Sequence, residues 1–413
     1  MTKVQHPISN YQCVSCGTEY EIEPFRYQCD CGENLDYIYN YNLIKRSWSK
    51  QTLAENPDRS HWRYLPLLPV QNVPENRSLQ VGGTPLISFP EIANEFQIAN
   101  FYIKDDTRNP SGSLKDRASD IGIQHATELG EETIVAASTG NAAASLAALS
   151  AFYGKKAVII APASAPKAKL TQILQYGATL ILVKGSYDDA FDLSKKVVEK
   201  YGWYSRSTGI NPVLSEGKKT VALEIAEQLN WKVPDKVFVP VGDGCIIGGV
   251  YKGFYDLLQL GWTSRIPKII AVQAEDSAAI VTALMHDRSI EPVKAKTIAD
   301  SISVDMPRDG MKAIRAVRKS GGFGVTVTDD EILSAQKDLA SSSGIFAEPA
   351  ASATYAGFLI ALNDGKVKKS DEIVILITGS GLKDIPAAQK KISIPDPITP
   401  DLDHFKEAIY FIS

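Results

Sequence analysis

Lys115 stands in this sequence where a lysine could react as well as carry charge. It follows the run Asn-Pro-Ser-Gly-Ser-Leu (residues 109–114) and precedes a helical stretch. Proline and glycine interrupt regular structure, so we expect this lysine at the start of an element, facing a cavity. An amine that is fixed there and partly desolvated can be neutral and nucleophilic. An unreactive loop lysine is the alternative interpretation of this motif taken alone.

Three more polar or glycine-rich loops come just after apolar, strand-like runs. They are residues 138–142 (Ser-Thr-Gly-Asn-Ala), 242–249 (Gly-Asp-Gly-Cys-Ile-Ile-Gly-Gly) and 378–384 (Thr-Gly-Ser-Gly-Leu-Lys-Asp). Open α/β sheets bind ligands at the carboxyl ends of their strands. Each loop by itself could be a helix cap or an ordinary strand-to-helix turn. The four loops together predict one binding cleft.

The elements that must position these loops are short strands that alternate with helices. Apolar runs predict strands at 101–103, 133–136, 156–161, 179–183, 203–206, 236–240, 268–273, 324–327 and 373–377, and the patterns between them predict helices at 141–153, 166–176 and 187–200. This alternation predicts an α/β fold with open, mostly parallel sheets.

Taken together and in this order, the four loops resemble those of the fold-type II (tryptophan synthase beta-like) pyridoxal-phosphate enzymes, and most of all the threonine synthases. The resemblance extends from about Gly82 to about Asp384. It implies two α/β domains with pyridoxal 5′-phosphate in the cleft between them, and a homodimer. The expected division is a cysteine-rich, zinc-ribbon-like β-hairpin module (1–40), an extended arm (41–80), a large cofactor-binding domain (81–118 and 211–395), a small substrate-binding domain (119–210) and a tail (396–413).

The resemblance also implies roles for residues of the four loops. Lys115 would form the internal aldimine with pyridoxal phosphate and then move protons between substrate carbons. Thr378 would face the pyridine nitrogen of the cofactor, and Asn141 would bind its ring oxygen. The substrate α-carboxylate would bind Ser138, Thr139, Asn141 and Ala142, and the cofactor phosphate would bind Gly242, Asp243, Gly244, Cys245 and Ile246. Asp243 suits a phosphate site only if its carboxylate points away.

The resemblance implies a pyridoxal-phosphate-dependent lyase that converts O-phospho-L-homoserine and water to L-threonine and phosphate, by γ-elimination and then β-addition. One departure from the family concerns the groups that grip the substrate phosphate. Leu214 stands where many members have an arginine, and Thr208 and Gly209 replace an Asn-Ser pair. The cations that could grip the phosphate instead are Arg206, Lys218 and Arg308.

The departure at Leu214 keeps other activities open. One is β-replacement on O-phosphoserine, as in the related cysteate synthase, and another is a threonine or serine dehydratase. A non-catalytic homologue that binds pyridoxal phosphate is a third, but the loss of Lys115 or of the phosphate loop would favour it, and both are present. Glu348, in a Glu-Pro segment that also resembles the family, either lines the site or caps the helix that follows.

Four of the five cysteines lie before residue 32, in the pairs Cys13-x-x-Cys16 and Cys29-x-Cys31. Two thiolate pairs separated by a hairpin are typical of a rubredoxin-type or zinc-ribbon knuckle, although the second pair is tighter than usual. A zinc ion here would be structural, because four protein thiolates leave no open coordination position. A metal-free hairpin and a redox-active pair are the alternatives.

The 413-residue chain is long enough for two or three domains. Its net charge of −4 gives no electrostatic argument for binding nucleic acid or a membrane. The longest apolar runs are too short to span a bilayer, and no N-terminal targeting pattern is present. We therefore expect a cytoplasmic protein that acts on a small phosphorylated amino acid. An amphipathic piece at 404–412 in the tail could pack on a partner.

Overall fold

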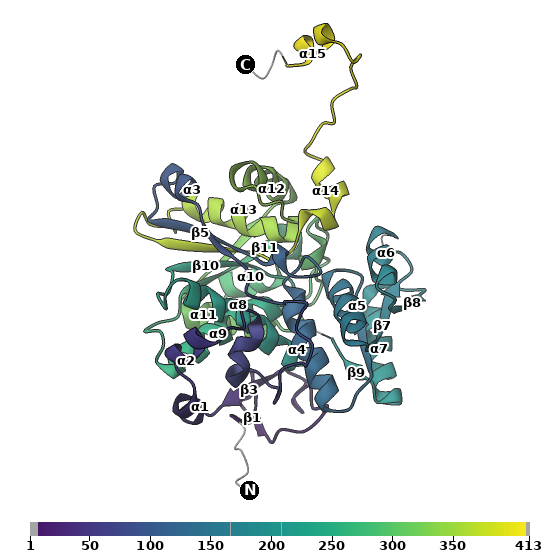
Figure 1. The fold of residues 1–413 in the computed structure, drawn as a ribbon, viewed down its shortest axis with the longest axis vertical. Coiled ribbons are helices and arrows are strands. Elements are labelled where there is room, and N and C mark those ends of the chain that lie inside the picture. Colours follow the sequence, from purple (N-terminus) through teal and green to yellow (C-terminus); the bar gives the residue numbers. More distant parts are fainter. Residues whose placement is uncertain (1–6, 166, 208, 410–413) are drawn as a thin grey trace.

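The computed structural model describes residues 7–165, 167–207 and 209–409. Thr208, one of the two residues that replace the Asn-Ser pair, lies outside the described residues, as do residue 166 of a predicted helix and residues 410–412 of the predicted terminal piece. The described chain forms a large domain, a small domain beside it, a small antiparallel sheet beneath them and a tail that stands away from the body (Figure 1).

The large domain is built on a six-stranded sheet with the order β12-β11-β10-β13-β5-β4. All neighbouring strands are parallel except β4, which pairs antiparallel with β5. Strands β10, β11 and β13 are buried along nearly their whole length, as expected where helices cover both faces of a parallel sheet. The bounds are β4 Leu86–Ser88, β5 Asn100–Asp105, β10 Lys236–Pro240, β11 Lys268–Ala274, β12 Gly324–Val327 and β13 Glu372–Ile377.

Successive residues of β10 point into two different cores. Val237 and Val239 pack with α8, α9 and α11, whereas Phe238 packs with α12 and α13 on the other face. This two-sided covering confirms the predicted α/β fold. The bounds are α3 Pro90–Glu95, α4 Lys115–Glu128, α8 Val213–Gln228, α9 Cys245–Leu260, α10 Ala279–Met285, α11 Gly310–Ser320, α12 Asp329–Ser343 and α13 Pro349–Asn363, with 3₁₀ turns η2 Asp106–Arg108, η3 Glu275–Ser277, η4 Asp300–Ile302 and η5 Gly381–Lys383.

The small domain holds a second, fully parallel sheet with the order β8-β7-β6-β9. Ile134 of β6 packs with α5 and α6 on one face, and Val135 packs against α7 on the other. The strand predicted at 203–206 is only two residues long, since it pairs with β6 over two positions and then leaves the sheet. The bounds are β6 Thr133–Ala137, α5 Asn141–Tyr153, β7 Lys156–Pro162, α6 Lys167–Gln175, β8 Thr179–Val183, α7 Tyr187–Tyr201 and β9 Tyr204–Ser205.

The cysteine module is a three-stranded antiparallel sheet of β1 Ile8–Cys13, β2 Glu19–Tyr20 and β3 Leu35–Tyr39. The segment after it forms α1 Tyr41–Ser47, α2 Lys50–Glu55 and the 3₁₀ helix η1 His61–Leu67, where the sequence predicts an extended arm. The side chains of Asn40, Ser49 and Ser60 cap these three helices. The apolar residues between the caps pack into the core of the large domain, and this packing stabilises helices too short to persist alone.

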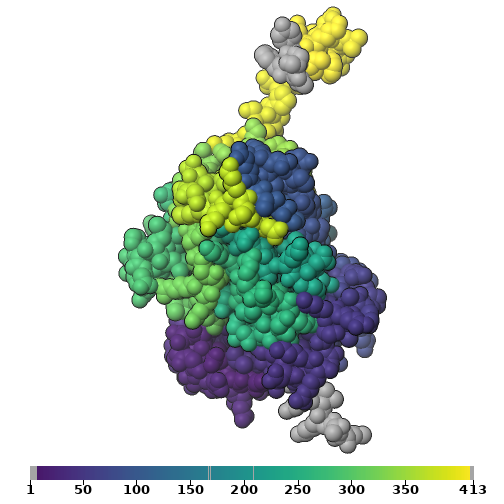
Figure 2. Space-filling model, turned by 90° about the vertical axis from the view of Figure 1, so that its left-hand side faces the viewer, coloured from purple at the N-terminus to yellow at the C-terminus, as the bar shows by residue number. Residues whose placement is uncertain are grey.

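The chain ends in α14 Ile385–Gln389 and α15 Leu402–Ile409. Helix α15 stands clear of the body, at the opposite end of the molecule from the cysteine module (Figures 1 and 2). All residues of α15 are exposed. No helix in the described part of the chain is both long enough and apolar enough to cross a membrane.

Candidate active site

A cavity of about 510 Å³ lies where loops of the two domains meet. The structure brings to its wall almost all the residues that the sequence nominates, although they come from five separate segments. These are Lys115, Ser138, Thr139, Asn141, Ala142, Arg206, Gly242, Asp243, Gly244, Cys245, Ile246 and Thr378. Arg308 and Glu348 line the same cavity. Lys218 is the exception, because its side chain is fully buried behind the wall.

Lys115 is the first residue of α4, as its turn-forming neighbours predict. The preceding turn is held by Asp116, whose carboxylate accepts hydrogen bonds from the N–H and the hydroxyl of Ser111, both at 2.6 Å. The N–H of Leu114 donates to the carbonyl of Thr378 at 2.9 Å, which joins the lysine loop to the end of β13. Burial lowers the pKa of the Lys115 amine, and the nearby Glu348 carboxylate opposes this shift.

A buried network of ion pairs connects the first turn of α4 to helix α8. Arg117 lies 2.7 Å from Asp106 and 2.6 Å from Glu224, and Lys104 lies 2.7 Å from the same glutamate. The cations hold the pKa of Glu224 well below its usual range, although burial alone would raise it. Because Arg117 is two residues from Lys115, this network fixes the start of α4 and with it the lysine.

The loop at residues 242–246, which we call the phosphate loop, leads from β10 into α9. Gly244 caps α9 with a φ of +97°, and a Cβ atom there would lie 2.6 Å from the carbonyl oxygen of Asp309. Only glycine fits both constraints. The carboxylate of Asp243 accepts the N–H of Arg308 at 3.1 Å, so it is engaged by the segment that precedes α11. The positive end of α9 faces the cavity.

Asn141 begins α5, and its Nδ2 donates to both carboxylate oxygens of Glu348 at 2.9 Å. Burial raises the pKa of Glu348. The side chain of Glu348 makes no capping hydrogen bond to α13, the helix that follows it. Of the two roles that the sequence allows for Glu348, the geometry supports lining the site.

Two buried cations lie next to Lys115. The guanidinium of Arg206 is 1% exposed, and it donates to the Ser119 hydroxyl at 3.0 Å and to the Lys115 carbonyl at 3.4 Å. The Nζ of Lys218 is buried and has no hydrogen-bond partner among the described residues. Burial lowers the pKa of Lys218 to about 8 and that of Arg206 to about 10. A buried ammonium without a partner is costly, which points to an anion that it binds.

Leu214 and Arg308 complete this part of the cavity region. Leu214 is fully buried, and its side chain packs against Gly122 of α4, where a Cβ atom would lie only 2.9 Å away. Arg308 pairs with Asp188 at 2.7 Å across the cavity mouth. The small space beside Gly122 explains why an apolar residue fits at position 214.

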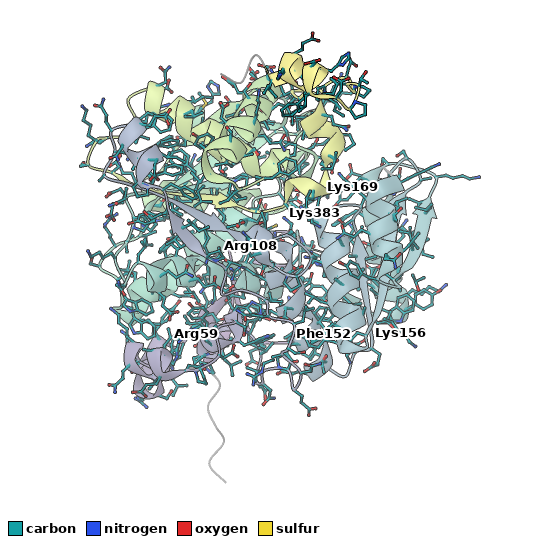
Figure 3. The ribbon with its side chains drawn as sticks, turned by 45° about the horizontal axis from the view of Figure 1, so that its top comes forward. Arg59, Arg108, Phe152, Lys156, Lys169 and Lys383 are labelled. Atoms are coloured by element: carbon teal, nitrogen blue, oxygen red, sulfur yellow. The ribbon has the colours of Figure 1, made fainter. Side chains whose placement is uncertain are left out.

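A second cavity of about 460 Å³ shares Asn141 and Glu348 with the first. Lys169 of α6 and Lys383 of η5 line it from the two domains, on either side of the interdomain gap in Figure 3. Burial lowers the pKa of Lys383. Neither lysine was predicted as a site residue from the sequence, although Lys383 stands in the glycine-rich loop after β13.

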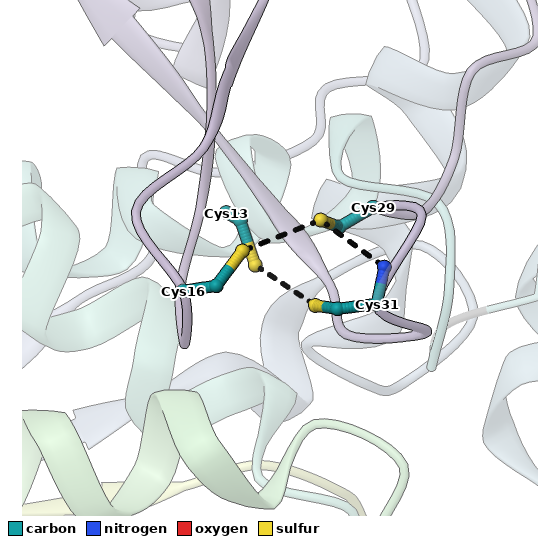
Figure 4. A group of neighbouring side chains, drawn as sticks. All are labelled: Cys13, Cys16, Cys29 and Cys31. Carbon is teal, nitrogen blue, oxygen red and sulfur yellow. Dashed lines mark hydrogen bonds between the residues drawn. The ribbon is translucent and has the colours of Figure 1, made fainter.

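The four cysteines of the N-terminal module meet in one cluster (Figure 4). Their sulfur atoms all lie within 4.8 Å of one another, with Cys13 3.6 Å from Cys31 and Cys16 3.5 Å from Cys29. All four are free thiols. A tetrahedral zinc site with Zn–S bonds of about 2.3 Å separates its sulfurs by about 3.8 Å. The cluster therefore fits a Cys₄ metal ion.

Comparison with known proteins finds relatives that match most of the chain. A sequence model described as "Pyridoxal-phosphate dependent enzyme" matches residues 77–379. A threonine synthase of Methanocaldococcus jannaschii is 40% identical over 401 residues, which cover 96% of this chain and 98% of that protein. A threonine synthase of Methanosarcina acetivorans is 38% identical over 97% of this chain and 98% of its own length.

Solved structures share the fold at lower identity. A fungal L-serine ammonia-lyase from Rhizomucor miehei superposes with a TM-score of 0.64 at 23% identity, over 75% of this chain and 98% of that one. Threonine deaminase isoform 2 from Solanum lycopersicum gives a TM-score of 0.64 at 24% identity, over 74% and 86% of the two chains. At such identities the likeness shows the fold alone.

Proposed function

Because the chain belongs to the threonine synthase family of pyridoxal-phosphate-dependent enzymes, we propose that it is a lyase converting O-phospho-L-homoserine and water to L-threonine and phosphate. The observation that carries this proposal is the pair of buried cations, Arg206 and Lys218, beside Lys115. The positive end of α9 already suits one phosphate, that of the cofactor. Two further cations suit a second phosphate, that of the substrate.

The cavity also fits pyridoxal phosphate itself. The cramped, left-handed Gly244 and the start of α9 form a cradle for its phosphate. Lys115 would hold the aldehyde group, Asn141 would contact the ring oxygen, and Thr378 would face the ring nitrogen. Once bound, the cofactor supplies an electron sink for the charge left at the substrate Cα. A neutral hydroxyl from Thr378 moderates that sink, which suits elimination and addition.

Lys115 would also move protons at the substrate. Its lowered pKa increases the fraction of neutral amine, which can take a proton from Cα. The substrate α-carboxylate would bind at the start of α5, where Ser138 and Thr139 precede a helix of 13 residues. Arg206, which lines the cavity, would hold the γ-phosphate as it leaves, and the ammonium of Lys218 behind the wall would add positive charge nearby. Water then adds at Cβ.

Leu214 favours a second candidate function. Its apolar side chain fills the space where many threonine synthases carry a phosphate-binding arginine, so the pocket could instead suit O-phosphoserine or a free hydroxyamino acid. The second candidate is therefore β-replacement on O-phosphoserine, or a threonine or serine dehydratase.

Product analysis separates these functions. Cofactor-loaded protein is offered O-phosphohomoserine, O-phosphoserine with and without sulfite, and free threonine, and phosphate, keto acids and amino acids are measured together. Threonine and phosphate in equal amounts from O-phosphohomoserine are expected. Turnover of another substrate, with none of O-phosphohomoserine, would refute the proposal and make Leu214 the mark of a changed substrate.

Borohydride reduction tests the role of Lys115 directly. Reduction of the loaded protein should fix the cofactor covalently on one peptide, the one that contains Lys115. Lys115→Ala should yield no labelled peptide and lose turnover by several orders of magnitude. A label on any other lysine would refute the catalytic assignment.

We propose that the cysteine cluster holds a structural zinc ion. The support is the four free thiols at distances that suit a tetrahedral ion. Purified protein should contain one zinc per chain, and Cys13→Ser should lose the metal and lower the Tm. Folded protein that is purified from cells supplied with zinc and yet contains no bound metal would contradict this proposal. Gln12→Ala, in the same strand, is the control.

A homodimer in the cytoplasm is the remaining part of the proposal. The support for a dimer is the family resemblance and the exposed apolar side chains of α15. Sedimentation of the purified chain at micromolar concentration measures the subunit number, and fractionation of the native cell measures the location. A monomer in sedimentation would refute the dimer, and recovery of the protein in the membrane fraction would refute the cytoplasmic location.

A further inference from the structure

Asn34 ties together the two cysteine turns of the N-terminal module. It comes three residues after Cys31, and its carbonyl accepts the N–H of Val14, the residue after Cys13, at 3.1 Å. One residue before it, the carbonyl of Glu33 accepts the N–H of Cys29 at 2.8 Å. Asn34 is 3% exposed. Its position therefore depends on both halves of the cysteine cluster.

The side chain of Asn34 reaches out of the module to the active-site domain. Its Nδ2 donates to the Arg308 carbonyl at 2.9 Å and to the Asp309 carboxylate at 2.7 Å. The backbone N–H groups of the same two residues donate to Asp243, at 3.1 Å to its carboxylate and at 2.9 Å to its carbonyl. The segment Arg308–Asp309 thus links the side chain of Asn34 to the phosphate loop by hydrogen bonds on both sides.

Asp309 and the phosphate loop are in close backbone contact, with no space between them. A Cβ atom on Gly244 would lie 2.6 Å from the Asp309 carbonyl, so the two backbones touch. Lys312, one turn into α11, fixes the module from the other side: it donates to the Leu35 carbonyl at 2.9 Å and lies 3.1 Å from Asp36. A displacement of Asn34 would therefore pass through Asp309 to the start of α9.

We infer that Asn34 is a positioning residue for the cofactor phosphate, and that the cysteine module braces the phosphate loop through it. The residues 77–379 matched by the family model do not include the module, so the brace is an addition to the shared catalytic body. A metal ion that fixes the cysteine turns also fixes Asn34, so metal and cofactor bind cooperatively. The inference rests on the proposed use of residues 242–246 for the cofactor phosphate.

The test is the affinity for pyridoxal phosphate, measured by absorbance titration of the full-length apoprotein. Asn34→Ala should raise the Kd about tenfold, because it removes a pair of buried hydrogen bonds that hold the loop. Asn34→Ser, a smaller polar change, should lie between Asn34→Ala and wild type. The kcat at saturating cofactor should stay near wild type, since Asn34 touches no substrate. Gln12→Ala should leave the Kd unchanged, because the Gln12 side chain donates to Glu19 of the same module, at 3.4 Å, and to no other residue that the structure describes.

Metal removal tests the coupling. Chelation of the metal should raise the wild-type Kd for pyridoxal phosphate by a similar factor and speed amide hydrogen exchange in residues 243–248. In Asn34→Ala, chelation should raise this Kd little further. An unchanged Kd in folded Asn34→Ala would overturn the inference, as would chelation that weakens cofactor binding equally in both proteins. A different outcome separates the two proposals. If Asn34→Ala weakens the binding of pyridoxal phosphate but the wild-type protein does not turn over O-phosphohomoserine, the proposed reaction is refuted and the positioning role of Asn34 is supported.

Discussion

At the scale of single residues, Lys218 and Leu214 form a pair on one helix. They are four positions apart on α8, so they lie on similar sides of it, and the longer side chain leans toward the N-terminus where Leu214 sits. Lys218 can thus bring its ammonium close to position 214. Because Leu214 itself packs against Gly122, the positive charge on this part of α8 comes from Lys218.

Replacing Lys218 with methionine should improve stability and harm function. Burial lowers the pKa of Lys218 from 10.5 to about 8, so the charged form destabilises the folded apoprotein by about 3 kcal/mol at neutral pH. Lys218→Met should recover part of this lost stability, and the gain should appear as a higher urea concentration at the unfolding midpoint. It should also raise the KM for O-phosphohomoserine by about 10- to 100-fold, because a buried positive charge close to the substrate phosphate is lost. A destabilised variant with an unchanged KM would contradict both roles.

The same lysine predicts a pH dependence. Below about pH 8 its ammonium is present in the free protein, and it is lost as the pH rises through that value. Affinity for the phosphorylated substrate should therefore be full below about pH 8 and fall above it. Lys218→Arg, which stays charged, should shift this fall to higher pH. Identical pH profiles of KM in wild type and Lys218→Arg would exclude Lys218 as the titrating group.

At the scale of elements, the ionic network between α4 and α8 decides how firmly Lys115 is held. Glu224→Gln should destabilise the protein by about 3–5 kcal/mol, because it leaves Arg117 and Lys104 buried with one fewer carboxylate. Urea unfolding measures the loss. Glu132→Gln is the matched control, because Glu132 is mostly exposed and its pair with Lys155 is screened by solvent, so this substitution should change the stability little. Equal losses in the two variants would contradict the network's role.

At the scale of the whole molecule, the tail is the feature without a partner in the described chain. Leu402, Phe405 and Ile409 lie on one side of α15 and are all exposed. A second copy of the chain is the partner that the predicted dimer supplies. A chain ending at Lys391 should sediment as a monomer and keep its affinity for pyridoxal phosphate. A truncated protein that remains a dimer would place the interface elsewhere on the body.

Local pattern in the sequence determined the class of fold and the position of Lys115 at the start of a helix. Pro110 and Gly112 interrupt regular structure between β5, which ends at Asp105, and α4, and this local pattern predicts Lys115 at the start of a helix. Alternating apolar runs gave the strands with ends that differ by a residue or two. Such signals are short-range, because backbone breakers and periodicity act within one element.

Only the tertiary structure decided which distant residues meet. The bond from Asn34 to Asp309 spans 275 positions and that from Asn141 to Glu348 spans 207, and no local pattern encodes such a pairing. The helices of residues 41–67 and the cavity between Lys169 and Lys383 likewise depend on packing against other elements. The sequence nominated Lys115 and Lys218 as separate residues, but the burial of Lys218 beside the cavity and the hydrogen bonds of Asn34 depend on contacts that exist only once the chain is folded.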